Sequence, residues 1–125
     1  MIDAPDVRAW SLASAGARIA IGLGMLAAPE LALRALGFEG VTPATVAVGR
    51  IAGVRDLALG AATIAALEDR DRLRTATLAN AVADAGDTIA FGIALSNSER
   101  TAGARGIVAA FPAAIAGAWV AWRLS

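Results

Sequence analysis

Residues 43–67 read PATVAVGRIAGVRDLALGAATIAAL, an apolar stretch that carries Arg55 and Asp56 near its centre. Two further apolar stretches have ionisable residues at a similar place: Arg18 in residues 10–28, and Asp84 with Asp87 in residues 73–95. Charge in the middle of an apolar helix is costly unless partners satisfy it, and in membrane proteins such residues commonly mark the working site. The pattern therefore indicates where to look for a site, but it does not name a reaction or a ligand.

The composition is strongly apolar. Hydrophobic residues make up 58% of the 125 residues and the mean hydropathy is +0.63, whereas soluble domains contain about 45–50% apolar residues. All 11 basic residues are Arg and are balanced by 11 acidic residues, so no positive field exists that would attract a nucleic acid. The chain contains no Cys, His or Tyr, which removes disulfides and nearly every transition-metal site, and we expect no metal and no cofactor.

Breaks in the apolar pattern divide the chain into four long helices and one short helix. The predicted long helices cover residues 9–28, 43–67, 73–95 and 104–124. Pro29 opens a short segment that Gly37 closes, and this segment is too short to span a bilayer. No segment alternates with period two, so strands are not expected. We predict an all-α fold in one domain, residues 1–125: an up-down bundle of four transmembrane helices, with a short interfacial helix between the first two.

The two faces of the third long helix favour a membrane protein. Its polar residues fall on one side of a 3.6-residue helix: Thr77, Asn80, Asp84, Asp87 and Thr88. The opposite side is apolar and too broad to be buried among only four helices. Lipid outside and polar contacts within explain this pattern best, and we expect the lipid bilayer as the main partner. A soluble bundle is the alternative, because Ala is only marginally hydrophobic.

The arginines near the helix ends predict the orientation. On one side they are Arg8, Arg70, Arg72, Arg74 and Arg123, and on the other side Arg34, Arg100 and Arg105. Because cytoplasmic loops carry the excess of basic residues, we expect both termini in the cytoplasm. The localisation we infer is a bacterial inner (plasma) membrane, with the three Trp residues at its cytoplasmic interface.

The ionisable residues are expected to meet inside the bundle. Arg18, Arg55, Asp56 and Asp84 lie near the midpoints of their helices, Arg50 lies nearer the outer end, and Asp87 lies one turn outward from Asp84. Gly49, Gly53 and Gly60 share one line with Asp56, which allows a neighbouring backbone to approach closely. Three arginines facing three aspartates would make the interior neutral. The predicted ligand-binding residues are Arg18, Arg50, Arg55, Asp84 and Asp87, and the candidates for acid–base catalysis are Asp84, Asp87 and Asp56.

The first half of the chain resembles the DoxX-like group of small four-helix membrane proteins, which includes families of unknown function. The residues that carry the resemblance are Arg18, Pro29, Leu36-Gly37-Phe38, Gly49-Arg50, Arg55-Asp56-Leu57-Ala58-Leu59-Gly60 and Asp84. The resemblance implies mainly the fold. Some members of the group are described as quinone-linked oxidoreductase subunits, whereas this chain has no redox motif.

Two functions follow from the buried charges. In the first, the Arg/Asp pocket binds a small lipophilic or amphiphilic molecule, with or without acid–base chemistry. In the second, the protein is a structural or accessory subunit whose charges fix helix packing and assembly, since buried ion pairs can serve to set helix partners. Proton or ion translocation ranks last, because four helices leave little room for a conduit and a homo-oligomer would be needed. Whether the chain is an enzyme stays open.

Overall fold

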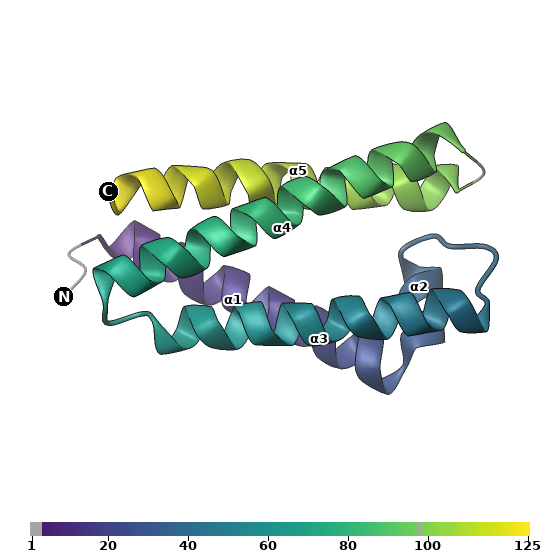
Figure 1. The fold of residues 1–125 in the computed structure, drawn as a ribbon, viewed down its shortest axis with the longest axis horizontal. Coiled ribbons are helices and arrows are strands. Elements are labelled where there is room, and N and C mark those ends of the chain that lie inside the picture. Colours follow the sequence, from purple (N-terminus) through teal and green to yellow (C-terminus); the bar gives the residue numbers. More distant parts are fainter. Residues whose placement is uncertain (1–3, 98) are drawn as a thin grey trace.

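The computed structural model describes residues 4–97 and 99–125. These residues form five helices and no strand: α1 (Pro5–Ala27), α2 (Pro29–Ala35), α3 (Pro43–Ala65), α4 (Arg70–Ser96) and α5 (Arg100–Arg123) (Figure 1). The predicted all-α fold class is confirmed over these residues. α1 starts earlier than expected, at Pro5, because proline suits the first helical position. α5 also starts earlier, at Arg100 rather than at about residue 104.

The starts of α3 and α4 follow from capping side chains. Thr42 accepts a hydrogen bond from the Thr45 backbone N–H at 3.2 Å, and Thr45 Oγ1 accepts one in return from the Thr42 N–H at 3.3 Å. This reciprocal pair satisfies two backbone donors that the first helical turn leaves free. At α4, Asp69 accepts from the Arg72 N–H at 3.0 Å. The short helix α2 ends before Gly37, whose φ of 97° lies in the left-handed region that favours glycine.

The long helices associate as two pairs, α1 with α3 and α4 with α5, which lie in two layers in Figure 1. Close contact within the α1/α3 pair depends on glycine. A Cβ atom on Gly22 would lie 2.7 Å from the carbonyl oxygen of Gly53, and one on Gly60 would lie 3.0 Å from the carbonyl oxygen of Ala15. The predicted glycine line of residues 43–67 therefore does receive a neighbouring backbone, and that backbone is α1.

The two helix pairs meet at one end of the molecule, and at the other end α5 contacts the short helix α2. At the end that holds the termini (Figure 1), a buried apolar cluster joins residues from α1, α4, α5 and the α3–α4 turn: Val7, Ala66, Leu67, Leu73, Val120 and Leu124. At the opposite end, Arg105 of α5 donates to the carbonyl oxygen of Ala35 at 2.8 Å. The middle of the contact between the pairs is occupied by charged side chains instead.

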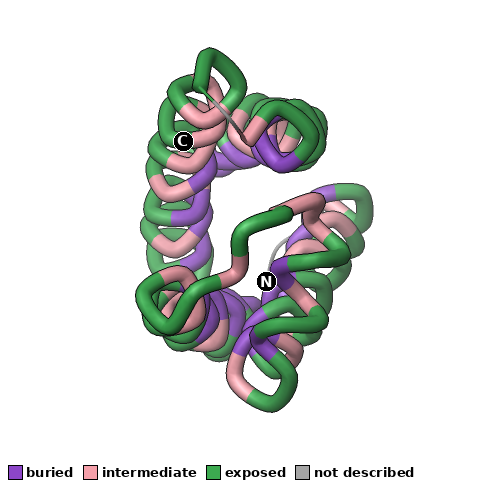
Figure 2. The backbone as a smooth tube through the Cα atoms, turned by 90° about the vertical axis from the view of Figure 1, so that its right-hand side faces the viewer, coloured by how far each residue is buried: buried purple, intermediate pink, exposed green. Residues whose placement is uncertain are grey.

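Many large apolar side chains are exposed, and several polar and charged side chains are buried; Figure 2 shows how the buried and exposed positions are distributed along the backbone. Val82 of α4 and Val108 of α5 are 72% and 75% exposed, whereas Thr77 is fully buried and Asn80 is 1% exposed. This distribution reverses that of a water-soluble helix bundle. It agrees with the predicted faces of the third long helix, and it is consistent with a lipid bilayer around the protein.

Three of the helices in the described part of the chain are long and apolar enough to cross a membrane: α1, α4 and α5. Their presence suggests an integral membrane protein. α3 is not among them, because Arg50, Arg55 and Asp56 interrupt its apolar stretch. The predicted count of four transmembrane helices is therefore not confirmed by length and composition.

Candidate functional site

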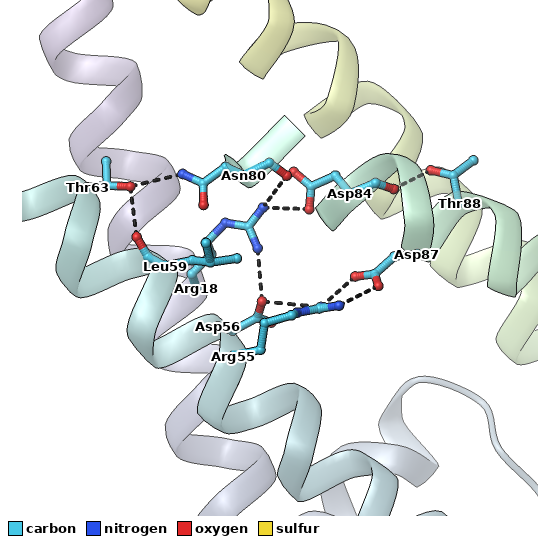
Figure 3. Close-up of polar contacts among 9 residues, drawn as sticks. All are labelled: Arg18, Arg55, Asp56, Leu59, Thr63, Asn80, Asp84, Asp87 and Thr88. Carbon is cyan, nitrogen blue, oxygen red and sulfur yellow. Dashed lines mark hydrogen bonds and ion pairs between the residues drawn. The ribbon is translucent and has the colours of Figure 1, made fainter. Parts of the chain in front are cut away.

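Arg18 is the centre of a charged cluster that connects three helices (Figure 3). Its side chain projects from α1 and the residue is only 7% exposed. Nη1 donates to Asp56 Oδ1 of α3 at 2.9 Å, and Nη2 donates to Asp84 Oδ1 of α4 at 2.6 Å. Nη2 also reaches the carbonyl oxygen of Asn80 at 3.3 Å. One guanidinium group thus joins the α1/α3 pair to the α4/α5 pair.

Arg55 and Asp87 form a second ion pair between α3 and α4. The contact is bidentate, with Nη1 to Oδ1 at 2.8 Å and Nη2 to Oδ2 at 2.7 Å, a geometry that gives direction as well as strength. Arg55 Nη2 also lies 3.4 Å from Asp56 Oδ1, so Asp56 is shared between Arg55 and Arg18. The two ion pairs are therefore parts of one network, the charged cluster, formed by Arg18, Arg55, Asp56, Asp84 and Asp87.

The cluster has a closed side and an open side. Around Arg18 the side chains are closely enclosed, with 8% of Arg18 and 11% of both Asp56 and Asp84 exposed. At the other side, 38% of the Arg55 side chain and 28% of the Asp87 side chain are exposed. Contact with the surroundings of the protein is thus made through Arg55 and Asp87.

Neutral polar side chains support the closed side. Asn80 Nδ2 donates to Thr63 Oγ1 at 2.9 Å, and the Thr63 hydroxyl donates to the Leu59 carbonyl oxygen at 2.9 Å (Figure 3). Thr63 was not among the predicted site residues. Its position could have revealed it, because Thr63 follows Asp56 by seven residues and therefore shares the helix face that carries Gly49, Gly53 and Gly60.

Three buried polar atoms of this region have no hydrogen-bond partner among the residues that the structure describes. They are Arg18 Nε, Arg55 Nε and Asn80 Oδ1. A buried donor or acceptor without a partner costs about 1–3 kcal/mol. Two of the atoms are donors, on Arg18 and Arg55, and one is an acceptor, on Asn80.

Among the described residues Arg50 forms no ion pair with the charged cluster, whereas we expected it to meet the aspartates of α4. It is exposed and lines a separate hollow of about 460 Å³ with Glu30 and Arg34, between α2 and α3. The residues that share this hollow with Arg50 belong to α2, α3 and the junction between α1 and α2, and none belongs to α4. The cluster contains two arginines and three aspartates, so its formal charge is negative by one and three arginines do not face three aspartates as we expected.

The chemistry open to the cluster follows from these pairs. Each of the candidate catalytic residues, Asp56, Asp84 and Asp87, accepts hydrogen bonds from an arginine. A second hollow, of about 520 Å³, lies between α3 and α4 near Ala66 and Arg72, and neither hollow is lined by these carboxylates. Within residues 4–97 and 99–125, no group of three or more acidic residues is placed to hold a metal ion.

Comparison with curated proteins found no match, and comparison with solved structures found none. One protein-family model matches residues 15–124, a range that contains the whole charged cluster, all of α2, α3, α4 and α5, and the second half of α1. The family is described as "Domain of unknown function", and the resemblance to the DoxX-like group is not shown by this match. The chain belongs to the family Domain of unknown function (DUF4267).

Proposed function

We propose that this chain is an integral membrane protein with a structural or accessory role, in which the charged cluster fixes the association of two helix pairs. The observation that carries the proposal is the position of Arg18, whose guanidinium contacts Asp56 of α3 and Asp84 of α4 at 2.9 and 2.6 Å. Between the two ends of the molecule, the contact between the helix pairs depends on these charged side chains. Their pairing therefore determines how α4 and α5 sit on α1 and α3.

α3 is the fourth membrane span in this proposal, and the whole chain forms one transmembrane domain. α3 has 23 residues, as many as α1, and it packs along α1. Its exposed side chains include Val48 and Ile51, at 65% and 70%. Asp56 is turned away from that surface and is paired, which removes most of the cost of a charge at the level of hydrocarbon. A DoxX-like arrangement of four spans belongs to the same proposal.

The buried pairs are better explained by specificity of packing than by added stability. A buried ion pair often contributes no more than well-packed apolar side chains would, but loss of one partner is strongly destabilising. A shift or rotation of α4 relative to α1 would separate these ion partners, and the cluster therefore raises the free energy of every such arrangement. Such a penalty is useful in an Ala-rich chain, because small, similar side chains discriminate poorly between helix registers.

A second candidate function is the binding of a small lipophilic or amphiphilic molecule at the open side of the cluster. It is favoured by the exposure of Arg55 and Asp87, since a partly exposed ion pair near the middle of a membrane span requires a polar neighbour. Arg55 Nε at this side, which has no partner among the described residues, supports it as well. A hydroxyl group can accept a hydrogen bond from this Nε–H. Acid–base chemistry by Asp84, Asp87 or Asp56 belongs to this candidate.

The orientation in the proposal places both termini in the cytoplasm of a bacterial inner membrane. It is supported by the arginines at that end and by the guanidinium of Arg123, which lies 5.2 Å from the ring centroid of Trp119. Trp and Arg side chains of this kind are common at membrane–water interfaces. In this orientation α2 lies at the outer interface.

Cysteine labelling tests the four spans, because the natural chain has no Cys and each introduced thiol is the only one. Single variants Glu39→Cys, Glu68→Cys, Ser96→Cys and Ser125→Cys are expressed in cells and treated with an impermeant maleimide. Four spans predict that the thiols at positions 39 and 96 react from outside and that the other two react only after lysis. Reaction of the thiols at positions 39 and 68 from the same side would show that α3 does not cross.

The ligand candidate is tested by thermal shift with decanol as the probe. The purified protein in detergent is compared with Arg55→Gln and with the control Arg100→Gln, which removes an exposed arginine at the far end of α5. Binding at the cluster predicts that decanol raises the melting temperature of the wild type and of the control but not of Arg55→Gln. Equal shifts in all three proteins would exclude this binding mode.

A further inference from the structure

We propose that the hollow between α2 and α3 binds the anionic head group of an amphiphile, through Arg34 and Arg50. The hollow is open to the surroundings and has a volume of about 460 Å³. The inference rests on the proposed membrane placement of α3, and it is independent of the role of Arg18.

The charge of the hollow favours an anion. Arg34 and Arg50 line it together with one carboxylate, Glu30, so the formal charge of its lining is positive. Within the described residues neither arginine takes part in an ion pair. Two unpaired guanidinium groups that line one hollow are suited to phosphate or carboxylate, because each can donate two parallel hydrogen bonds to such a group.

The depth of Arg50 gives a second reason for an anionic ligand. Arg50 lies seven residues beyond Pro43, the start of α3, which corresponds to about 10 Å at a rise of 1.5 Å per residue. An exposed arginine at this depth below the interface is costly unless its charge is satisfied from the head-group region. Arg34 on α2 lies across the same hollow and provides the second contact there.

The walls of the hollow indicate an attached acyl chain. Besides the charged side chains, it is lined by Ala28, Pro29, Leu31 and Val46. Leu31 is 70% exposed, on the short helix that we place in the interface. An acidic group therefore meets the arginines while a hydrocarbon chain lies along the apolar wall. The ligand class we assign is an amphiphile with a phosphate or carboxylate head, of which an acidic phospholipid is the simplest example.

A binding experiment with short-chain lipids tests the inference on the full-length protein in detergent. The probes are dihexanoyl phosphatidylglycerol, dihexanoyl phosphatidylcholine and inorganic phosphate, and binding is followed by native mass spectrometry. The variants are Arg34→Gln and Arg50→Gln, with Arg100→Gln as the matched control. We expect the phosphatidylglycerol to bind best, and each of the first two substitutions to weaken it about tenfold, as for loss of one charge-assisted contact, while the control binds as the wild type does.

Three other results would contradict the proposed head-group site. Equal binding of the two phospholipids, or equal weakening by Arg100→Gln, would show that Arg34 and Arg50 do not form a specific anion site. Equal binding of inorganic phosphate would remove the role of the apolar wall. The labelling pattern of Glu39→Cys and Glu68→Cys reports the membrane placement of α3 separately, so failure of the head-group site is distinguishable from failure of the four-span proposal.

Discussion

Arg18 Nη2 lies 2.6 Å from Asp84 Oδ1, and this contact links α1 to α4 across the boundary between the two helix pairs. The other terminal nitrogen of the same guanidinium holds Asp56 of α3 at 2.9 Å. Arg18 is therefore bonded both within its own pair and to the other pair. One contact, with Asp56, lies within the α1/α3 pair, and the other, with Asp84, joins the two pairs. Substitutions that change these contacts separately show whether Arg18 links the pairs or only packs within one of them.

Replacement of Arg18 by Gln is expected to destabilise the protein more than any other single change in the cluster. It leaves Asp56 and Asp84 without the cation that they share, and removal of one member of a buried pair costs about 3–5 kcal/mol. Asp84→Asn should cost only about 1 kcal/mol, since the amide keeps an oxygen acceptor and the excess negative charge of the cluster is removed. Chemical unfolding in detergent, followed by Trp fluorescence, gives both values. Equal losses for the two variants would contradict the assigned role of Arg18.

The Arg55–Asp87 pair is expected to contribute less than the contacts of Arg18. Its side chains are 38% and 28% exposed, and polar contacts between membrane helices typically contribute about 1 kcal/mol or less. Arg18, by contrast, is enclosed and contacts two carboxylates. A double-mutant cycle with Arg55→Gln and Asp87→Asn measures the coupling energy. The same cycle with Arg18→Gln and Asp56→Asn serves as the comparison and should give the larger value. A larger coupling energy for Arg55 and Asp87 would mean that the ion pair at the open side, and not Arg18, contributes most to the stability of the cluster.

Close approach of α1 to α3 requires Gly22. A methyl group there would lie 2.7 Å from the carbonyl oxygen of Gly53 and 2.7 Å from Leu57 Cγ, and overpacking of this kind costs about 1–3 kcal/mol. Gly22→Ala should therefore lower the free energy of unfolding. The matched control is Gly16→Ala in the same helix, where nothing lies within 4 Å, and where alanine should be neutral or stabilise by about 1 kcal/mol. If both variants are equally stable, α1 and α3 do not approach each other as closely at Gly22 as described above.

Much of the arrangement could be predicted from helical periodicity. The positions of Thr77, Asn80 and Asp84 on one face of α4 follow from a repeat of 3.6 residues, and all three are buried. The glycine line of α3 likewise predicted a close neighbour. These features could be found because each depends only on spacing within one helix.

The neighbours of each helix could not be predicted in the same way. Periodicity gives the faces of α3, but whether Arg50 meets α2 or α4 depends on how the short helix folds back over α3. The association of α1 with α3 and of α4 with α5 is a tertiary choice that spacing within a helix does not determine. The exclusion of Arg50 from the cluster, and with it the excess negative charge, became visible only once these neighbours were known.

Distance measurement between spin labels tests the link between the helix pairs most directly. Leu23→Cys on α1 and Val108→Cys on α5 report the separation of the pairs, and Val82→Cys with Val108→Cys reports the α4/α5 pair alone; all three positions are exposed. In lipid nanodiscs, Arg18→Gln should broaden the distance distribution between Leu23 and Val108 and leave the distribution between Val82 and Val108 narrow. An unchanged narrow distribution between Leu23 and Val108 would contradict the proposal that Arg18 holds the two pairs together.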